Sequence, residues 1–278
     1  MATAFKWALE FSSPMALIAL ATTVSWCFFS VRIFFAGRLQ SLREMTRGLV
    51  FRCLLLGLLN PAFYYWILFT AYDLLPAQDA MAINYSWGLT LPLIAAFFSR
   101  TLPNKHEAGL ALLSYLGILT IATNGNLVSL EFDRPLGVAL AILSTVIWGL
   151  SWVINSRVTD ANEIDPELAL FLNFSAALPV LWIAVGLSGK LPNTSMGFLL
   201  SGLYIGLFEM GIAFVLWMNA MRLTDNPLRI SSLIFLAPPL SLLMIGKVLN
   251  EPISHSTLMG LVIILIGLAG QHWLDQTR

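Results

Sequence analysis

The chain has 278 residues, of which 58% are hydrophobic and 11% are charged, and its formal net charge is zero. A soluble domain carries roughly 25% charged residues, so this composition excludes an ordinary soluble protein. Zero net charge gives no electrostatic basis for binding nucleic acid. Cys27 and Cys53 form no metal-binding spacing. The sequence therefore predicts a membrane protein without a metal or another cofactor.

Nine apolar segments follow one another along the chain, separated by short polar connections. A helix needs about 20 apolar residues to cross the hydrocarbon core, and a lone strand leaves its backbone unpaired in lipid. The predicted fold class is therefore an all-α polytopic membrane protein with nine spans. The segments are 14–36, 53–72, 80–99, 108–123, 136–156, 168–187, 197–221, 230–246 and 257–274.

Lysine and arginine are distributed unequally between the two sets of helix ends. Eleven lie in the set that contains Arg43 and Arg278, and four lie in the set that contains Lys190. Because positive residues accumulate on the cytoplasmic side, the C-terminus is predicted to be in the cytoplasm. The expected location is the cytoplasmic (inner) membrane, with multiple passes. Nine spans then place the N-terminus outside.

A run of motifs near the C-terminus has a weaker copy in the first half of the chain. An apolar run interrupted by Pro238 and Pro239 is followed by the polar turn NEPIS and by a glycine-rich apolar run. The spacing from Ile83 to Pro92 repeats the spacing from Ile230 to Pro239. Proline removes a helical hydrogen bond, so Pro92, Pro238 and Pro239 are predicted to act as kinks or hinges. Internal duplication of this kind is typical of membrane transporters.

The order of these motifs resembles the drug/metabolite transporter superfamily in its EamA-type branch. The stretch STVIWGLSWVINSR at 144–157 is similar to the start of that family's second repeat. The stretch INYSW at 83–87 resembles a motif of YddG-type aromatic amino acid exporters, to which the chain is distantly similar. The resemblance implies ten helices in two inverted five-helix repeats.

The first half of the chain has one span fewer than a five-helix repeat. Residues 1–130 are predicted to form a truncated first repeat of about four spans, and residues 131–278 a complete second repeat of five. The stub at 4–14 is similar to the end of a family first helix, so the resemblance implies that most of this helix is missing. The alternative is a short interfacial helix at 2–12.

Glu209 is an acidic residue at the centre of segment 197–221. A charge at the bilayer centre costs about 2.5–3.5 kcal/mol, which favours a role in binding a substrate amine or a proton. A protonated Glu209 bonded to a neighbouring helix is the structural alternative. Asn60 is the predicted counterpart, because Gly57–Asn60 and Gly206–Glu209 have the same spacing. The alternative for Asn60 is a hydrogen bond between helices.

Aromatic residues near the same segments are further candidates for binding substrate. The resemblance implies that Tyr85 and Trp87, next to Asn84, line a central cavity opposite Trp148. Trp148 and Trp152 are four residues apart and share a helix face. Aromatic walls suit apolar substrates and cations. The alternatives are an aromatic belt at the membrane interface and ordinary packing.

These observations predict a secondary transporter that exports amino acids or similar small metabolites by alternating access. The alternative is an integral-membrane enzyme acting on lipid or lipid-linked substrate, but the sequence contains no HExxH, GxSxG or glycine-rich phosphate loop. The expected partners are a small-molecule substrate and the lipid bilayer, with no nucleic acid. A homodimer is left open.

Overall fold

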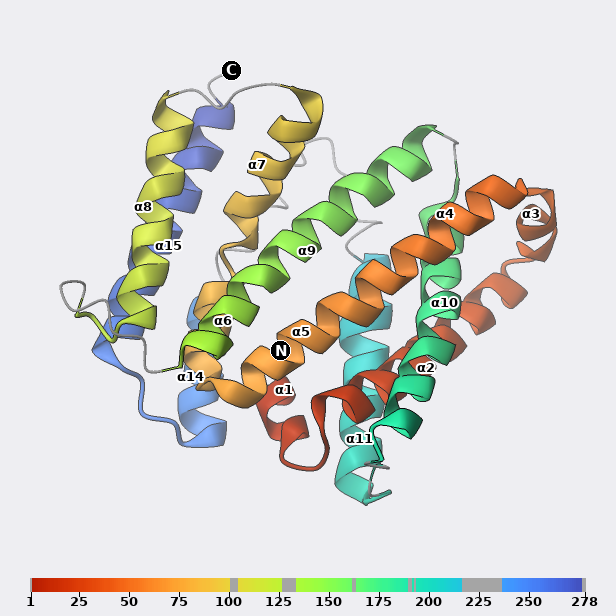
Figure 1. The fold of residues 1–278 in the computed structure, drawn as a ribbon, viewed down its shortest axis with the longest axis horizontal. Helices are drawn as coiled ribbons and strands as arrows, with labels where there is room; N and C mark the ends of the chain where they lie inside the picture. Colours follow the sequence, from red (N-terminus) through yellow and green to blue (C-terminus); the bar gives the residue numbers. More distant parts are fainter. Residues whose placement is uncertain are drawn as a thin grey trace. The chain divides into compact units, whose positions relative to one another are not determined.

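All regular elements in the described part of the protein are helices (Figure 1). The computed structural model describes residues 2–100, 105–126, 134–161, 164–189, 192, 194–216 and 237–276. A helix pairs its backbone groups within one segment, which is what a chain of this hydropathy requires in lipid. The all-helical prediction is confirmed for the described residues.

Within the described ranges, six helices are long and apolar enough to cross a membrane, which confirms a multi-pass membrane protein. They are Pro14–Phe35, Arg47–Leu74, Pro135–Thr159, Pro166–Leu187, Met196–Leu216 and His255–Leu274. Ala108–Ala122 and Ala237–Leu249 are shorter apolar helices. Parts of the predicted segments 197–221 and 230–246 lie outside the described residues. Nine spans therefore stay a prediction.

The prediction of one continuous helix over 80–99 is wrong. The segment consists of α6 (Ala77–Asn84) and α7 (Trp87–Ser99), with a tight turn between them. The backbone N–H of Ser86 donates to the carbonyl of Ile83 at 3.1 Å, which is the shorter i→i+3 pattern. A break of two residues does not lower the hydropathy of the segment, so the sequence pattern misses it.

The short N-terminal helix α1 (Ala2–Leu9) is packed against protein. Ala2, Phe5 and Ala8 are buried. The Lys6 ammonium donates to the carbonyl oxygens of Tyr72 and Leu75, each at 2.8 Å, at the C-terminal end of α5 (Tyr64–Leu74). A cation is favourable there because the last carbonyls of a helix lack intrahelical donors.

The chain forms two compact units, and each unit draws on both halves of the sequence. Unit 1 comprises residues 1–6, 70–150 and 224–278, and unit 2 comprises residues 7–69 and 151–223. The boundary passes through α9 (Pro135–Ala161), which contributes its first part to unit 1 and its last part to unit 2.

Unit 2 is held together by close helix contacts at two glycines. Gly57 ends α4 (Arg47–Gly57) and lies against the backbone of Asn173 in α10 (Pro166–Leu187). Gly206, in the segment after α11 (Met196–Tyr204), lies against the carbonyl of Ala21 in α2 (Pro14–Phe35). A side chain at either glycine would overlap the neighbouring backbone. Glycine therefore lets the backbones of each helix pair, α4 with α10 and the segment after α11 with α2, approach more closely than a residue with a side chain would allow.

A second link within unit 2 is an ion pair between the end of α2 and the start of α10. The Arg32 guanidinium donates to both carboxylate oxygens of Glu167, at 2.9 and 3.2 Å. Arg38, just before α3 (Leu39–Glu44), contacts Asp165 at 2.7 Å and Glu167 at 3.6 Å. Asp165 also caps α10 by accepting from the N–H of Glu167 at 2.8 Å.

We expect Arg32→Met to destabilise the protein by about 1–3 kcal/mol. Removing one partner of a fully buried pair costs about 3–5 kcal/mol, but the Arg32 side chain is 40% exposed while that of Glu167 is 11% exposed, so water screens part of the loss. Denaturant titration in detergent measures the change. The double variant Arg32→Met/Glu167→Met should recover part of it, and Arg43→Met, on exposed α3, should change little. Equal stability of Arg32→Met and Arg43→Met would contradict this role.

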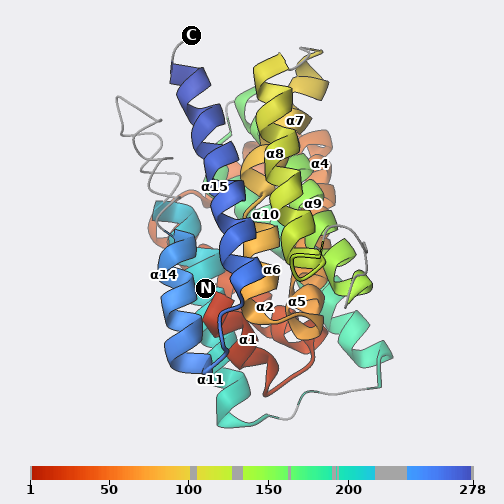
Figure 2. The same cartoon turned by 90° about the vertical axis from the view of Figure 1, so that its left-hand side faces the viewer.

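In unit 1, α8 (Lys105–Ala122) and α15 (His255–Gln276) lie side by side along their length (Figure 2). A Cβ added at Gly117 would meet the carbonyl of Gly260 at 2.6 Å, and one at Gly260 would meet the carbonyl of Gly117 at 2.5 Å. The Ser114 hydroxyl also donates to the carbonyl of Ile264 at 3.4 Å. Small residues thus let two backbones approach where lipid provides no hydrophobic force between helices.

The NEPIS turn is hydrogen-bonded to the start of α6 within unit 1. Both carboxylate oxygens of Glu251 accept from the backbone N–H of Ala77, at 3.0 and 3.4 Å. The Gln78 amide donates to the carbonyl of Pro252 and accepts from the N–H of Ser254, each at 3.0 Å. Glu251 therefore supplies an acceptor at a helix N-terminus, where backbone donors are otherwise unpaired.

Candidate functional site

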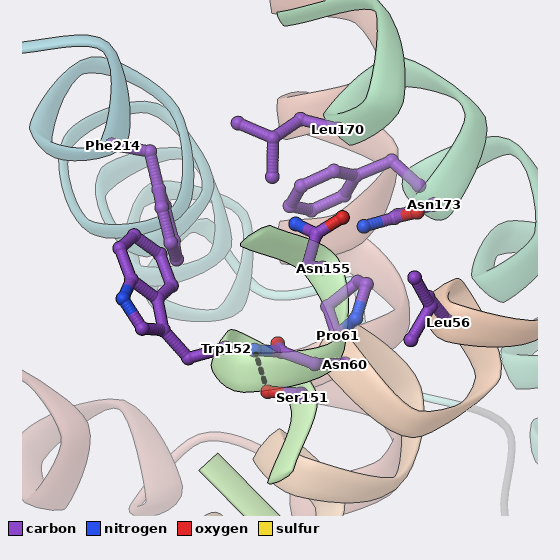
Figure 3. Close-up of a pocket in the computed structure, with 10 residues that line it drawn as sticks. Leu56, Asn60, Pro61, Ser151, Trp152, Asn155, Leu170, Asn173 and Phe214 are labelled. Atoms are coloured by element: carbon purple, nitrogen blue, oxygen red, sulfur yellow. Dashed lines mark hydrogen bonds between the residues drawn. The ribbon is translucent and has the colours of Figure 1, made fainter. Parts of the chain in front are cut away.

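A small polar cavity lies inside unit 2, and Figure 3 shows its walls. Its volume is about 20 Å³, enough for one water-sized group. Three asparagines, one serine and several apolar or aromatic side chains form the walls. The residues are Leu56, Asn60, Pro61, Ser151, Trp152, Asn155, Leu170, Asn173, Phe174 and Phe214. A polar cavity in an apolar helix bundle is a candidate site for a ligand.

The cavity forms where the helix that continues from α4 is interrupted. The segment η1 (Leu58–Phe63) spans a kink between two helices, where Asn60 has the non-helical angles φ −145° and ψ 116° and the Asn60–Pro61 peptide bond is cis. Pro61 has no backbone N–H to donate, so the regular ladder cannot continue through it. The Asn60 side-chain amide donates to the Ser151 hydroxyl at 3.1 Å. This break places the Asn60 amide in the cavity wall.

Two further amides complete the polar side of the cavity. The Asn173 amide is oriented by its acceptors, because its Nδ2 can donate to the carbonyls of Cys53 at 2.7 Å and Ala169 at 3.0 Å. The Oδ1 atom of Asn155 is buried and has no hydrogen-bond partner among the described residues. In Figure 3 the side chains of Asn155 and Asn173 face each other. A buried amide oxygen without a donor costs about 1–3 kcal/mol, unless a bound group supplies the donor.

An aromatic wall stands beside these amides. Figure 3 shows Trp152 next to Phe214, and both line the cavity. Aromatic faces attract cations and pack on apolar groups. The cavity therefore combines hydrogen-bond acceptors with a surface that suits an apolar or cationic group.

Glu209 lies in unit 2 but is not among the residues that line this cavity. It is in the π-helical segment η2 (Ile205–Ile212), which begins next to the Gly206 contact. Its side chain is partly buried, and its carboxylate has no hydrogen-bond partner among the described residues. The buried phenol of Tyr65 lies within electrostatic range of this carboxylate. Of the two residues that sequence spacing pairs, Asn60 thus lies at a kink and Glu209 lies in a π-helical segment, a feature that occurs often at functional sites.

The other aromatic candidates lie in unit 1. The rings of Trp87 and Trp148 make an edge-to-face contact with centroids 6.2 Å apart. The Asn84 amide donates to the Ser144 hydroxyl at 3.0 Å, and Tyr85 occupies the turn between α6 and α7. The structure therefore brings Trp87 and Trp148 together in unit 1, as it brings Asn60 and Trp152 together in unit 2.

Hydroxyl groups gather beside the same turn in unit 1. The Thr90 hydroxyl lies 3.2 Å from that of Thr145 and 3.3 Å from that of Tyr115. The Ser86 hydroxyl is fully buried and has no hydrogen-bond partner in the part of the chain that the structure describes. This cluster was not predicted, because its hydroxyls come from sequence positions far apart and meet only through helix packing.

The predicted hinge prolines are only partly described. The Pro92 side chain lies outside the described part of the structure, although α7 is helical through that position. Pro238 and Pro239 occupy the first turn of α14 (Ala237–Met244), where proline is tolerated, and the residues before Ala237 lie outside the described ranges. The breaks that the structure does show are at Asn60 and between α6 and α7.

No group of three potential metal ligands from His, Cys, Asp and Glu occurs among the described residues. The cavity in unit 2 offers amide and hydroxyl oxygens rather than carboxylates, thiolates or imidazoles. Its chemistry is therefore that of binding through neutral hydrogen-bonding groups.

Comparisons with known proteins place this arrangement in a family. One solved structure, described as "Crystal structure of protein", aligns with a TM-score of 0.65 at 21% sequence identity, covering 99% of this chain and 96% of that chain. This likeness shows the fold. Among curated proteins, none matches. The model of the EamA-like transporter family matches residues 1–123 and 135–270, so the chain belongs to the EamA-like transporter family.

Proposed function

We propose that the protein is a secondary transporter that exports amino acids or similar small metabolites across the cytoplasmic membrane. Membership of the EamA-like family makes it a membrane transporter of small molecules. The observation that carries the finer proposal is the cavity in unit 2, because neutral amides beside aromatic faces suit a solute with both a polar and an apolar part.

Transport in this proposal proceeds by alternating access, with residues 1–130 and 131–278 acting as the two repeats. A cavity of about 20 Å³ holds one small group, whereas pockets for whole small molecules measure roughly 300–1,000 Å³. A solute therefore needs the cavity to widen. The interruption of the helix at Asn60 supports such movement, since a broken helix can bend without losing further backbone hydrogen bonds.

Flux in proteoliposomes tests this function. The purified protein is reconstituted into vesicles loaded with a mixture of labelled amino acids and amines, and efflux is compared with vesicles lacking protein. Protein-dependent efflux of chemically unchanged solute supports export. Conversion of lipid or solute without flux would instead support the alternative of an integral-membrane enzyme.

The charge distribution predicts that the C-terminus is cytoplasmic and that the connection after α10 faces outside. Reporter fusions after Gly189 and after Arg278 test this topology, and a fusion after Glu44 serves as a second cytoplasmic point near the exposed arginines of α3. We expect cytoplasmic reporter activity after Glu44 and Arg278 and external activity after Gly189. The opposite pattern would invert the proposed orientation.

A further inference from the structure

We propose that the cavity between Asn60, Asn155 and Asn173 is a subsite for the primary ammonium group of the transported solute. This inference rests on the proposed export of amino acids or similar metabolites and names the part of the solute that unit 2 recognises.

The first argument is the balance of donors and acceptors in the wall. The Asn60 Nδ2 is used by the Ser151 hydroxyl, and the Asn173 Nδ2 is used by the carbonyls of Cys53 and Ala169. The Asn173 amide therefore has its oxygen as its remaining group, whereas the Asn60 amide keeps its oxygen and one N–H. Among the described residues, the buried Asn155 Oδ1 has no donor. A bound group that carries N–H donors would satisfy these oxygens.

The second argument is charge and size. The described residues that line the cavity carry no charged side chain, so a carboxylate or phosphate would find no cation there. An ammonium group has three N–H donors and no acceptor, which matches converging oxygens. It also has roughly the size of the water-sized group that a cavity of about 20 Å³ holds. The faces of Trp152 and Phe214 add an attraction for positive charge.

The third argument is the position of Glu209. This carboxylate does not line the cavity, so it is not the group that receives the amine there. The sequence predicts two alternative roles for Glu209, binding an amine and carrying a proton. In this proposal the two roles belong to different residues. The asparagines bind the amine, and Glu209 remains available for the proton.

Thermal unfolding of the purified full-length protein in detergent tests the subsite without requiring transport. The probes are methylammonium, tetramethylammonium and sodium chlorides at equal ionic strength. Methylammonium is expected to raise the melting temperature in a concentration-dependent way, because a ligand of the folded state stabilises it. Tetramethylammonium, which has the same charge but no N–H donor, and sodium are expected to give no comparable rise.

Asn155→Leu should weaken methylammonium binding by about 10- to 100-fold, the range for losing a hydrogen bond to a charged group. The matched control is Thr22→Val in unit 2, which removes a buried hydroxyl that has no partner among the described residues and does not line the cavity. It should bind methylammonium as the unmodified protein does. If Asn155→Leu does not fold, Trp152→Leu serves as the second variant and should also weaken binding.

Equal stabilisation by sodium would show a general site for small cations and would overturn the proposal. An absence of methylammonium stabilisation, or unchanged binding in both cavity variants, would also overturn it. Failure of export is a separate result, because methylammonium binding with no protein-dependent flux would remove the transport function while the subsite remained.

Discussion

Glu209→Gln is expected to abolish coupled transport while the protein still folds. Glutamine has nearly the same shape but cannot take up or release a proton. Because the substitution keeps the size of this partly buried side chain, it should break little structure. We expect flux in proteoliposomes to fall by about 100-fold or more, the scale on which a positioned proton-transfer group acts.

The response to pH distinguishes the roles of Glu209. A proton carrier should lose the pH dependence of its residual flux when replaced by glutamine, and should keep its affinity for methylammonium. An amine-binding residue should instead lose affinity for amines at every pH. Glu44→Gln is the control, since Glu44 is exposed on α3 and bonded to Gln40. A Glu209→Gln protein with unmodified flux and pH profile would show that Glu209 is structural.

Gly57→Ala is expected to cause the largest loss of stability from a single added methyl group. The new Cβ would overlap the backbone carbonyl of Asn173, which no rotamer change can move aside. Overpacking costs typically 1–3 kcal/mol when side chains can adjust, so we expect about 3 kcal/mol or more here. Relief by separating α4 from α10 would also displace Asn173 from the cavity, so methylammonium binding should be lost. Denaturant titration and the thermal assay measure both effects.

Gly48→Ala is the matched control, because Gly48 lies in the same helix and a Cβ there meets nothing within 4 Å. Alanine is the better helix former, so this change should be neutral or slightly stabilising. Similar stability of the two variants would mean that α4 and α10 do not approach each other as closely as described.

The helices could be predicted from the sequence because their signal is local. Long apolar runs with charges at their ends predicted α2, α9, α10 and α15 close to their observed bounds. The π-helical segment η2 and the turn after Asn84 could not be predicted. Neither an extra residue in a helical turn nor a two-residue break changes the mean hydropathy of a segment, so a hydropathy pattern does not reveal them.

The candidate site could be predicted only in part. Matching glycine spacings drew attention to Asn60 and Glu209, and the helix face of Trp148 and Trp152 drew attention to the second tryptophan. Asn155 and Asn173 gave no such signal, since Asn155 stands at the polar end of its segment and no repeated spacing marks Asn173. Their convergence depends on the packing of α10 against η1, a long-range contact that spacing does not encode.

Each unit contains helices from both halves of the sequence, so neither unit can complete its packing until the second half has been synthesised. Unit 2 lacks α10 and α11 until the second half of the chain is made, and α8 of unit 1 waits for α15. At about 5–20 residues per second, this wait lasts several seconds or more. During this time, the face of α8 that carries glycine and serine lies in the membrane without α15 packed against it. A ribosome-attached intermediate therefore carries unpaired helices that another membrane protein or an insertion factor can bind before the last helix arrives.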